Sequence, residues 1–146
     1  RFPRIRLKKE RIHMDNNNIA GIKGYYYQLQ QITSLLNLSL LEIRQKYINY
    51  PYCLIDYFEK GVEEKSIEIR FDQEEFTLTC LFSNEGKCEF VYLFPDKNEY
   101  VKGFISYLEI TQNYDYLMNR WAIPGCYIKA KAIEHLSNDI CLMFYN

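Results

Sequence analysis

The chain has 146 residues, of which 48% are hydrophobic and 25% are charged, and its formal net charge is −1. This length suits one domain with one core, and the balance of apolar and charged residues excludes a disordered chain. No apolar run approaches the roughly 18 residues that a membrane-spanning helix needs, and no signal-peptide pattern is present. We therefore expect a soluble, cytoplasmic domain that makes no membrane contact.

Residues 1–14 form a basic N-terminal arm, and we expect residues 15–146 to be a single α+β domain. The His13–Met14 pair leaves two interpretations of the arm open, a native extension or a vector remnant that precedes a natural start at Met14. A polar linker over residues 15–18 is expected to separate the arm from the domain.

Apolar residues recur at intervals of three and four from Tyr25 to Tyr47, which predicts an amphipathic helical region. Ser39 and Glu42 have the spacing of a capping box, so a second helix is expected to begin there. A strand over residues 25–30 is the alternative. Residues 52–59, which follow a proline, fit either a short helix or a buried strand.

Three segments in which apolar residues recur at every second position predict the clearest strands of the chain, although the other face of the last two segments is mixed. They cover residues 67–72, 76–82 and 88–94. Residues 83–87 fit a short hairpin loop in which Gly86 adopts the left-handed conformation. The resulting register pairs Phe82 with Cys88 and assigns one set of residues in the last segment to the core, namely Phe90, Tyr92 and Phe94.

The second half of the chain predicts helices and a final hairpin. Asp96 and Glu99 indicate the start of a helix, and a short helix over residues 116–122 is expected to anchor Trp121 in the core. Residues 126–145 are expected to form a hairpin, with a helix over residues 129–136 as the alternative. The expected fold is α+β: a mainly antiparallel sheet with a three-strand meander (about residues 66–94) plus a C-terminal hairpin, with helices packed on one face.

The composition favours binding over catalysis. The chain contains 14 Tyr and only two His. Tyr combines a large apolar ring with a hydroxyl that can stay in water, and it is enriched at protein interfaces, whereas His is the usual acid–base residue near neutral pH. The five cysteines are scattered, and none forms a C-x-x-C pair, so we expect no disulfide framework, no metal site and no cofactor.

The charges are unevenly distributed along the chain. Residues 1–13 carry six basic groups and one acid, whereas residues 56–99 carry 12 acids and five bases, a net charge of −7. An acidic region of this kind attracts a basic protein and repels the phosphates of nucleic acid. Nucleic acid is therefore a poor candidate ligand for the main body, and residues 1–13 are the part of the chain expected to contact it.

A candidate contact surface lies where tyrosines adjoin acidic residues. Each unpaired buried hydroxyl costs about 1–3 kcal/mol, so several tyrosines are expected at the surface. The expected partner-binding residues are Tyr47, Tyr50, Tyr52, Asp56, Tyr57, Glu59, Glu63 and Glu64. We hypothesise a non-catalytic protein of the inhibitor, immunity or adaptor type that presents this surface to a basic partner, of which a nuclease toxin is one example.

No local pattern predicts a catalytic residue. A divalent-metal nuclease would need an acid and then an acid-x-Lys on the next strand, and the strand that follows Asp72 contains no Lys. The alternative hypothesis is a small ligand-binding or enzymatic domain with its site on the second face of the sheet. The residues for that site would be Thr77, Thr79, Glu89, Tyr127 and His135.

Overall fold

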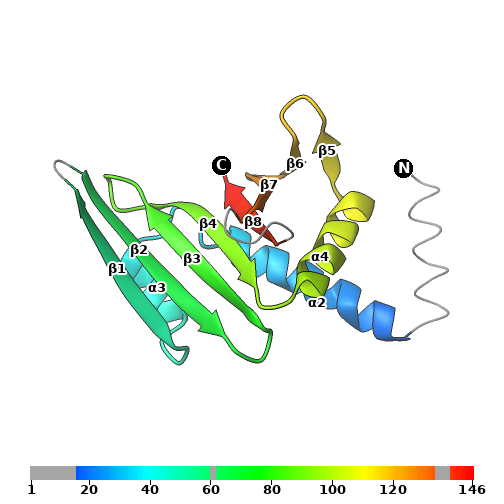
Figure 1. The fold of residues 1–146 in the computed structure, drawn as a ribbon, viewed down its shortest axis with the longest axis horizontal. Helices are drawn as coiled ribbons and strands as arrows, with labels where there is room; N and C mark the ends of the chain where they lie inside the picture. The colour runs from blue at the N-terminus through cyan, green and yellow to red at the C-terminus, as the bar shows by residue number, and fades with distance from the viewer. Residues whose placement is uncertain (1–15, 60–61, 134–138) are drawn as a thin grey trace.

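An eight-stranded antiparallel sheet and three helices make up the described part of the chain, which has a mixed α/β fold (Figure 1). The computed structural model describes residues 16–59, 62–133 and 139–146, with side chains over 24–55, 66–133 and 139–146. The basic arm of residues 1–14 and His135 lie outside the described residues. The expected antiparallel sheet is confirmed, but it contains more strands than the sequence predicts.

Two helices precede the sheet in the chain, α2 over Asn16–Thr33 and α3 over Leu40–Lys46. The predicted capping box is present. The Ser39 hydroxyl accepts a hydrogen bond from the Glu42 N–H at 3.2 Å, and the Glu42 carboxylate accepts one from the Ser39 N–H at 3.1 Å. The expected polar linker is wrong for residues 16–18, because α2 has already begun there.

The eight strands follow in chain order, and one helix interrupts them. Their bounds are β1 Tyr52–Glu59, β2 Val62–Phe71, β3 Phe76–Phe82, β4 Cys88–Pro95, β5 Asn113–Asp115, β6 Arg120–Ile123, β7 Cys126–Ala132 and β8 Ile140–Tyr145. Helix α4, Asn98–Thr111, lies between β4 and β5. The spatial order is β1-β2-β3-β4-β8-β7-β6-β5, so the last strand lies in the interior of the sheet.

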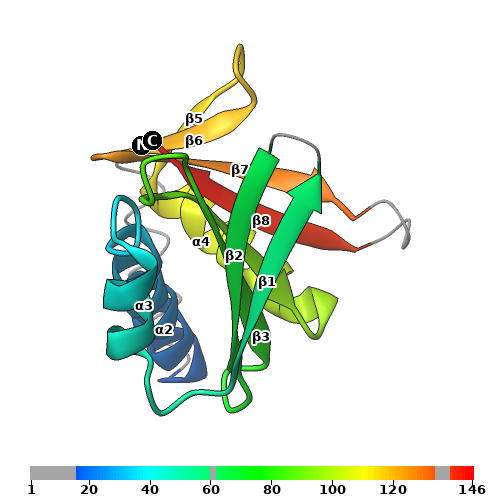
Figure 2. The same ribbon diagram turned by 90° about the vertical axis from the view of Figure 1, so that its left-hand side faces the viewer.

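One face of the sheet and the helices enclose the hydrophobic core. Figure 2 shows α2 and α3 on the same side of β1, β2 and β3. The strands contribute buried alternate residues, which include Ile67, Ile69, Leu78, Cys80, Val91, Leu93, Leu142 and Phe144, and the helices contribute Leu29, Ile32, Ile43, Phe104 and Leu108. This alternation is the reason that the period-two segments form strands with one buried face.

A β-bulge between Leu81 and Phe82 decides which face of β4 is buried. Leu81 pairs with Phe90, and Cys80 therefore pairs with Val91 rather than with Phe90. The sequence-derived register is wrong for three residues, Phe90, Tyr92 and Phe94, which lie on the face opposite the core. The physical reason is that a bulge adds one residue, and a slip of one residue exchanges the two faces of a strand.

The structure decides three segments that the sequence left open and corrects a fourth. Residues 25–30 are helical within α2, residues 52–59 form β1, and residues 129–132 belong to β7. The short helix predicted over residues 116–122 is wrong, because a turn leads there into β6. Trp121 is buried as expected, although it lies on a strand.

Helix α4 begins without the predicted Asp96–Glu99 cap. Its N-cap residue is Lys97, which makes no side-chain capping hydrogen bond. The helix approaches α2 closely at Gly103, where an added Cβ would overlap the Tyr25 hydroxyl and lie 3.0 Å from the Tyr25 Cζ. An alanine here would force the Tyr25 ring to shift, so glycine suits this close contact although it weakens the helix.

Candidate functional site

Five apolar side chains with solvent access lie together beside the first strand, and we call them the Tyr patch. They are Tyr27 of α2, Tyr47 and Tyr50 after α3, and Tyr52 and Leu54 of β1. Tyr27 is 61% exposed, and the last three are 39–45% exposed. Tyr27, Tyr47 and Tyr50 line one pocket. Tyr52 and Leu54 continue the patch along β1, since residues two apart share a face of a strand.

The Tyr patch is fixed by contacts with the core and with α3. The rings of Tyr47 and Tyr50 both pack on Phe71, with centroid distances of 5.2 and 4.7 Å. Arg44 donates a hydrogen bond to the Tyr52 hydroxyl at 2.8 Å, and its guanidinium lies 5.0 Å from the ring centroid. Burial raises the pKa of Tyr47 far above its ordinary value, so this hydroxyl stays protonated. Rings held in this way lose little conformational entropy on binding a partner.

The pocket within the Tyr patch is small. Its volume is about 60 Å³, and its walls include Tyr27, Tyr47, Tyr50, Phe71 and Glu74. Pockets for small-molecule substrates usually measure about 300–1,000 Å³. A depression of this size fits one short side chain of a partner better than it fits a substrate.

The acidic part of the expected site lies farther along the hairpin of β1 and β2. The backbone of this hairpin carries Asp56, Tyr57, Glu59, Glu63 and Glu64, whose side chains lie outside the described residues. Because a strand rises about 3.3 Å per residue, Glu59 lies about 23 Å from Tyr52 along β1. The structure therefore brings the tyrosines 47, 50 and 52 together and sets the acidic residues toward the other end of the strand.

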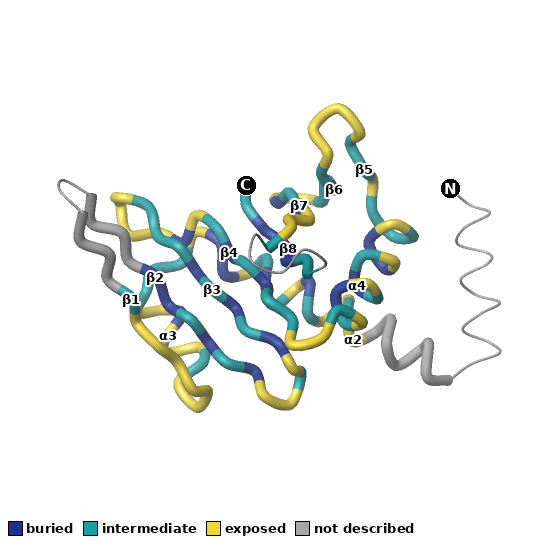
Figure 3. The backbone as a smooth tube through the Cα atoms, in the orientation of Figure 1, coloured by how far each residue is buried: buried dark blue, intermediate teal, exposed yellow. Residues whose placement is uncertain are grey.

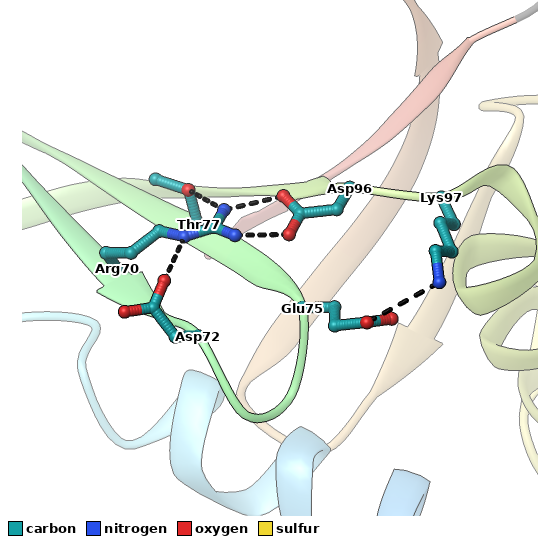
Figure 4. Close-up of polar contacts among 6 residues, drawn as sticks. All are labelled: Arg70, Asp72, Glu75, Thr77, Asp96 and Lys97. Atoms are coloured by element: carbon teal, nitrogen blue, oxygen red, sulfur yellow. Dashed lines mark hydrogen bonds and ion pairs between the residues drawn. The ribbon is translucent and has the colours of Figure 1, made fainter.

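The best-defined polar cluster joins β2, β3 and the end of β4 (Figure 4). Arg70 donates hydrogen bonds to Asp72 at 2.7 Å and to Thr77 at 3.2 Å, and it binds both carboxylate oxygens of Asp96. The hydrogen bonds from Arg70 lower the pKa of Asp96. Each charge in this cluster has a partner, so the cluster supports the sheet and offers no activated base.

A row of aromatic side chains crosses the face of the sheet opposite the core, and we call it the aromatic row. It consists of Phe94, Tyr92 and Phe90 of β4, Tyr145 of β8 and Tyr127 of β7, and it ends at Arg120 of β6. Neighbouring ring centroids are 5.6–6.5 Å apart. The Arg120 guanidinium lies 3.6 Å from the Tyr127 centroid and donates a hydrogen bond to the Tyr145 hydroxyl at 3.1 Å.

The four described residues of the alternative site, Thr77, Thr79, Glu89 and Tyr127, do not form one cluster. Thr77 accepts a hydrogen bond from Arg70, and Tyr127 lies three strands away, about 14 Å across the sheet. Glu89 is exposed at the bulge of β4. Residue 135 lies outside the described part of the chain.

The chain matches no protein-family model, no curated protein and no solved structure. In the part of the chain that the structure describes, no helix is both long and apolar enough to cross a membrane.

The cysteine thiols are suited to packing rather than to reaction. Cys80, Cys88, Cys126 and Cys141 are buried, whereas Cys53 is exposed, and all five are free. Burial raises the pKa of Cys126 to about 11, and a hydrogen bond with Cys88, together with burial, raises the pKa of Cys80. A nucleophilic cysteine needs the opposite shift. Among the described side chains, those of residues 24–55, 66–133 and 139–146, no three metal-ligating groups lie together.

The tip of the β5–β6 hairpin is exposed (Figure 3), and it carries a second group of apolar side chains with solvent access. Tyr116 and Leu117 are 83% and 94% exposed. The Asp115 carboxylate accepts hydrogen bonds from the N–H groups of Leu117 and Met118, at 3.0 and 3.2 Å, and so fixes the turn. This tip belongs to the opposite end of the strand order from the Tyr patch.

Proposed function

We propose that this chain is a small non-catalytic protein-binding domain, of the inhibitor, immunity or adaptor type, that engages a basic protein in the cytoplasm. The contact surface is formed by the Tyr patch and the acidic hairpin of β1 and β2. The observation that carries the proposal is the Tyr patch, in which aromatic rings reach solvent although the core beneath holds them in place. Pre-oriented aromatic anchors of this kind supply much of the binding energy at protein interfaces.

The charge of the chain supports a basic partner. Residues 56–99 have a net charge of −7, and the first residues of this acidic segment lie in the hairpin of β1 and β2. The charges next to the Tyr patch itself are mixed, with Arg44 and Lys46 on α3 and Glu74 in the pocket wall. We therefore assign binding energy to the patch and electrostatic steering to the hairpin.

The chemistry of the described side chains supports binding rather than catalysis. The pocket in the Tyr patch is too small for a substrate, and the carboxylate of Asp96 is neutralised by Arg70. Raised pKa values keep the thiols of Cys80, Cys126 and Cys141 protonated. A larger depression of about 370 Å³ lies between α3 and the β3–β4 hairpin, and none of its lining residues is an acid, a His, a Cys, a Lys or a Tyr: Ser39, Leu40, Leu41, Phe82, Ser83, Asn84 and Gly86. An active site would be expected to combine such a cleft with a titratable group shifted toward neutral pH.

The first test measures the kinetics of association. Affinity capture followed by mass spectrometry identifies the partner, and surface plasmon resonance then compares variants at low and high salt. The charge-reversed variant replaces four residues by Lys, namely Asp56, Glu59, Glu63 and Glu64. Its association rate at low salt should fall at least about tenfold, with little change in dissociation, because distant charges act mainly on encounter.

The second test removes one aromatic anchor. Tyr52→Ala should weaken binding by about 1–2 kcal/mol, mainly through faster dissociation. The matched control is Tyr116→Ala, which removes an even more exposed tyrosine from the far end of the sheet and should leave affinity unchanged. A partner that binds the charge-reversed variant and Tyr52→Ala as tightly as the wild type would contradict the proposal.

The aromatic row supports a second candidate function, the binding of a planar ligand on the opposite face of the sheet. The observation in its favour is the continuous series of half-buried rings that ends at the guanidinium of Arg120. Titration with the planar anionic fluorophore pyrene-1-sulfonate tests it. Dye binding that Tyr92→Ala and Tyr127→Ala both abolish would support this function, and binding unaffected by either would reject it.

A further inference from the structure

Strand β1 forms one edge of the sheet. It pairs antiparallel with β2 over all eight of its residues, and among the described strands it has no other neighbour. Figure 1 shows it at the outer side of the sheet. An edge strand carries a row of backbone N–H and C=O groups that can pair with an additional strand.

The register identifies the groups that face the open side. Arg70 donates its backbone N–H to the Pro51 carbonyl at 2.9 Å, so these two residues form a hydrogen-bonded pair. Hydrogen-bonded and non-hydrogen-bonded pairs alternate in an antiparallel ladder, so the next bonded pair on β1 is at Cys53. The N–H and C=O groups of Tyr52 and Leu54 therefore point away from β2, toward the open side.

This edge lacks most of the features that protect natural edge strands from pairing. Such strands are usually short, bulged, or guarded by Pro or Lys. β1 has eight residues, contains neither Pro nor Lys, and pairs with β2 without a shift in register. The strand at the other edge, β5, has only three residues.

We propose that the basic partner binds by adding an extended strand of its own to the open edge of β1. This inference rests on the proposed function and specifies how the same surface is used. The partner's main chain pairs with the outward groups of Tyr52 and Leu54, while the exposed side chains of these two residues provide specificity. Its basic side chains lie along the acidic hairpin.

Charge distinguishes this partner from a second copy of the chain. Residues 52–65 contain four acids and two bases, a net charge of −2. Edge-to-edge pairing of two copies would bring two such hairpins together, and like charges across strands are destabilising. A cationic strand gains attraction at the same edge.

The experiment uses the full chain and a defined probe, an acetylated and amidated octapeptide of alternating Lys and Val. The matched control peptide alternates Glu and Val. Amide hydrogen exchange measured by NMR follows the backbone N–H groups of Tyr52 and Leu54. Leu54→Pro removes one outward N–H without removing a hydrogen bond to β2, and an edge strand tolerates Pro at such an outward-facing position. Leu54→Ala is the matched variant, which removes the side chain but keeps the N–H.

The Lys–Val peptide should slow exchange at both amides in the wild type and bind Leu54→Ala with similar affinity. It should bind Leu54→Pro at least about tenfold more weakly than it binds the wild type. The Glu–Val peptide should bind the wild type more weakly than the Lys–Val peptide does, by a similar factor. The proposal is overturned if saturating Lys–Val peptide leaves both amides unprotected, or if it binds Leu54→Pro and Leu54→Ala equally. Equal binding of the two peptides, or protection of the same amides by protein concentration alone, overturns the choice of a basic partner.

The captured partner separates the two proposals. If Leu54→Pro keeps the affinity while the charge-reversed variant loses its fast association, strand addition is wrong and the proposed contact surface stands. If neither variant changes binding and Tyr52→Ala is also neutral, the proposed function fails together with the inference.

Discussion

Replacing Gly103 by Ala should destabilise the protein, although the substitution favours the helix that contains it. Gly103 lies in the interior of α4, where Ala is intrinsically better than Gly by about 1 kcal/mol. The added Cβ would overlap the hydroxyl of Tyr25 and lie 3.0 Å from its Cζ and 3.5 Å from its Cε2. The net effect therefore depends on whether the Tyr25 ring can move.

The ring of Tyr25 is enclosed by other aromatic side chains. Its centroid lies 5.7 Å from that of Tyr100, 5.3 Å from that of Phe104 and 5.9 Å from that of Tyr107. Overpacking at such a site costs about 1–3 kcal/mol. After the gain in helix propensity is subtracted, Gly103→Ala should lower the free energy of unfolding by up to about 2 kcal/mol.

Urea unfolding followed by far-UV circular dichroism measures this effect in two backgrounds. Tyr25→Phe removes the hydroxyl that the new Cβ would meet, so Gly103→Ala should cost at least about 1 kcal/mol less in that background. Gly24→Ala is the matched control, because Gly24 lies on the exposed side of α2 with nothing within 4 Å of a new Cβ. It should stabilise the protein by about 0.5–1 kcal/mol. If Gly103→Ala stabilises both backgrounds as Gly24→Ala does, the close contact with Tyr25 is refuted.

Three further predictions test the register, the ion pair and the helix cap. Val91→Lys places a charge on the buried face of β4 and should lower the free energy of unfolding by about 3 kcal/mol or more, whereas Tyr92→Lys, on the opposite face, should lower it by about 1 kcal/mol. Equal losses in urea unfolding would refute the bulged register. Because Arg70 lowers the pKa of Asp96 below its unfolded value of about 4, the stabilisation is present above that pH and is lost as the pH falls through the folded-state pKa. Asp96→Asn should therefore flatten the acid-induced fall of the urea midpoint, and an unchanged pH profile would contradict this assignment. Ser39→Ala should cost about 1 kcal/mol in thermal or urea unfolding, and a neutral result would show that the cap does not stabilise α3.

The helices and most strands could be predicted from the sequence because their signals are local. The break between α2 and α3 follows from Ser39 and Glu42, whose side chains bond to each other's backbone within one turn. The faces of β4 could not be predicted in this way. Both alternate sets of its residues are apolar, so periodicity does not distinguish them, and the bulge near Phe82 decides the outcome.

The β5–β6 hairpin was missed for a different reason. Strands of three and four residues are too short to show a period, and a stretch with Leu, Met and Trp has the composition of a helix. The strands form because the buried Trp121 pairs with Ile128 of β7, across the two-residue turn of Pro124 and Gly125, and this pairing is not visible as a period in so short a segment.

The candidate site was partly predictable. The cost of burying hydroxyls predicts surface tyrosines, and Tyr50 and Tyr52 are indeed exposed, although their role in binding stays a prediction. Tyr27 joins them through the packing of α2 against the loop after α3, a tertiary contact with no signal in the sequence. The aromatic row was missed together with the register of β4, because its three β4 rings were assigned to the core.

The position of β8 inside the sheet has a consequence for how the protein folds. The strands β1–β4 and β5–β7 are joined in the sheet only through β8, whose Leu142 pairs with Leu93, 49 residues earlier in the chain. Closing so long a loop costs entropy before its contacts form, so the docking of β8 should be slow compared with formation of the local hairpins. Until then β4 and the β8 strand of the β7–β8 hairpin expose unpaired backbone groups, and this intermediate is the form in which the protein should be most prone to aggregate.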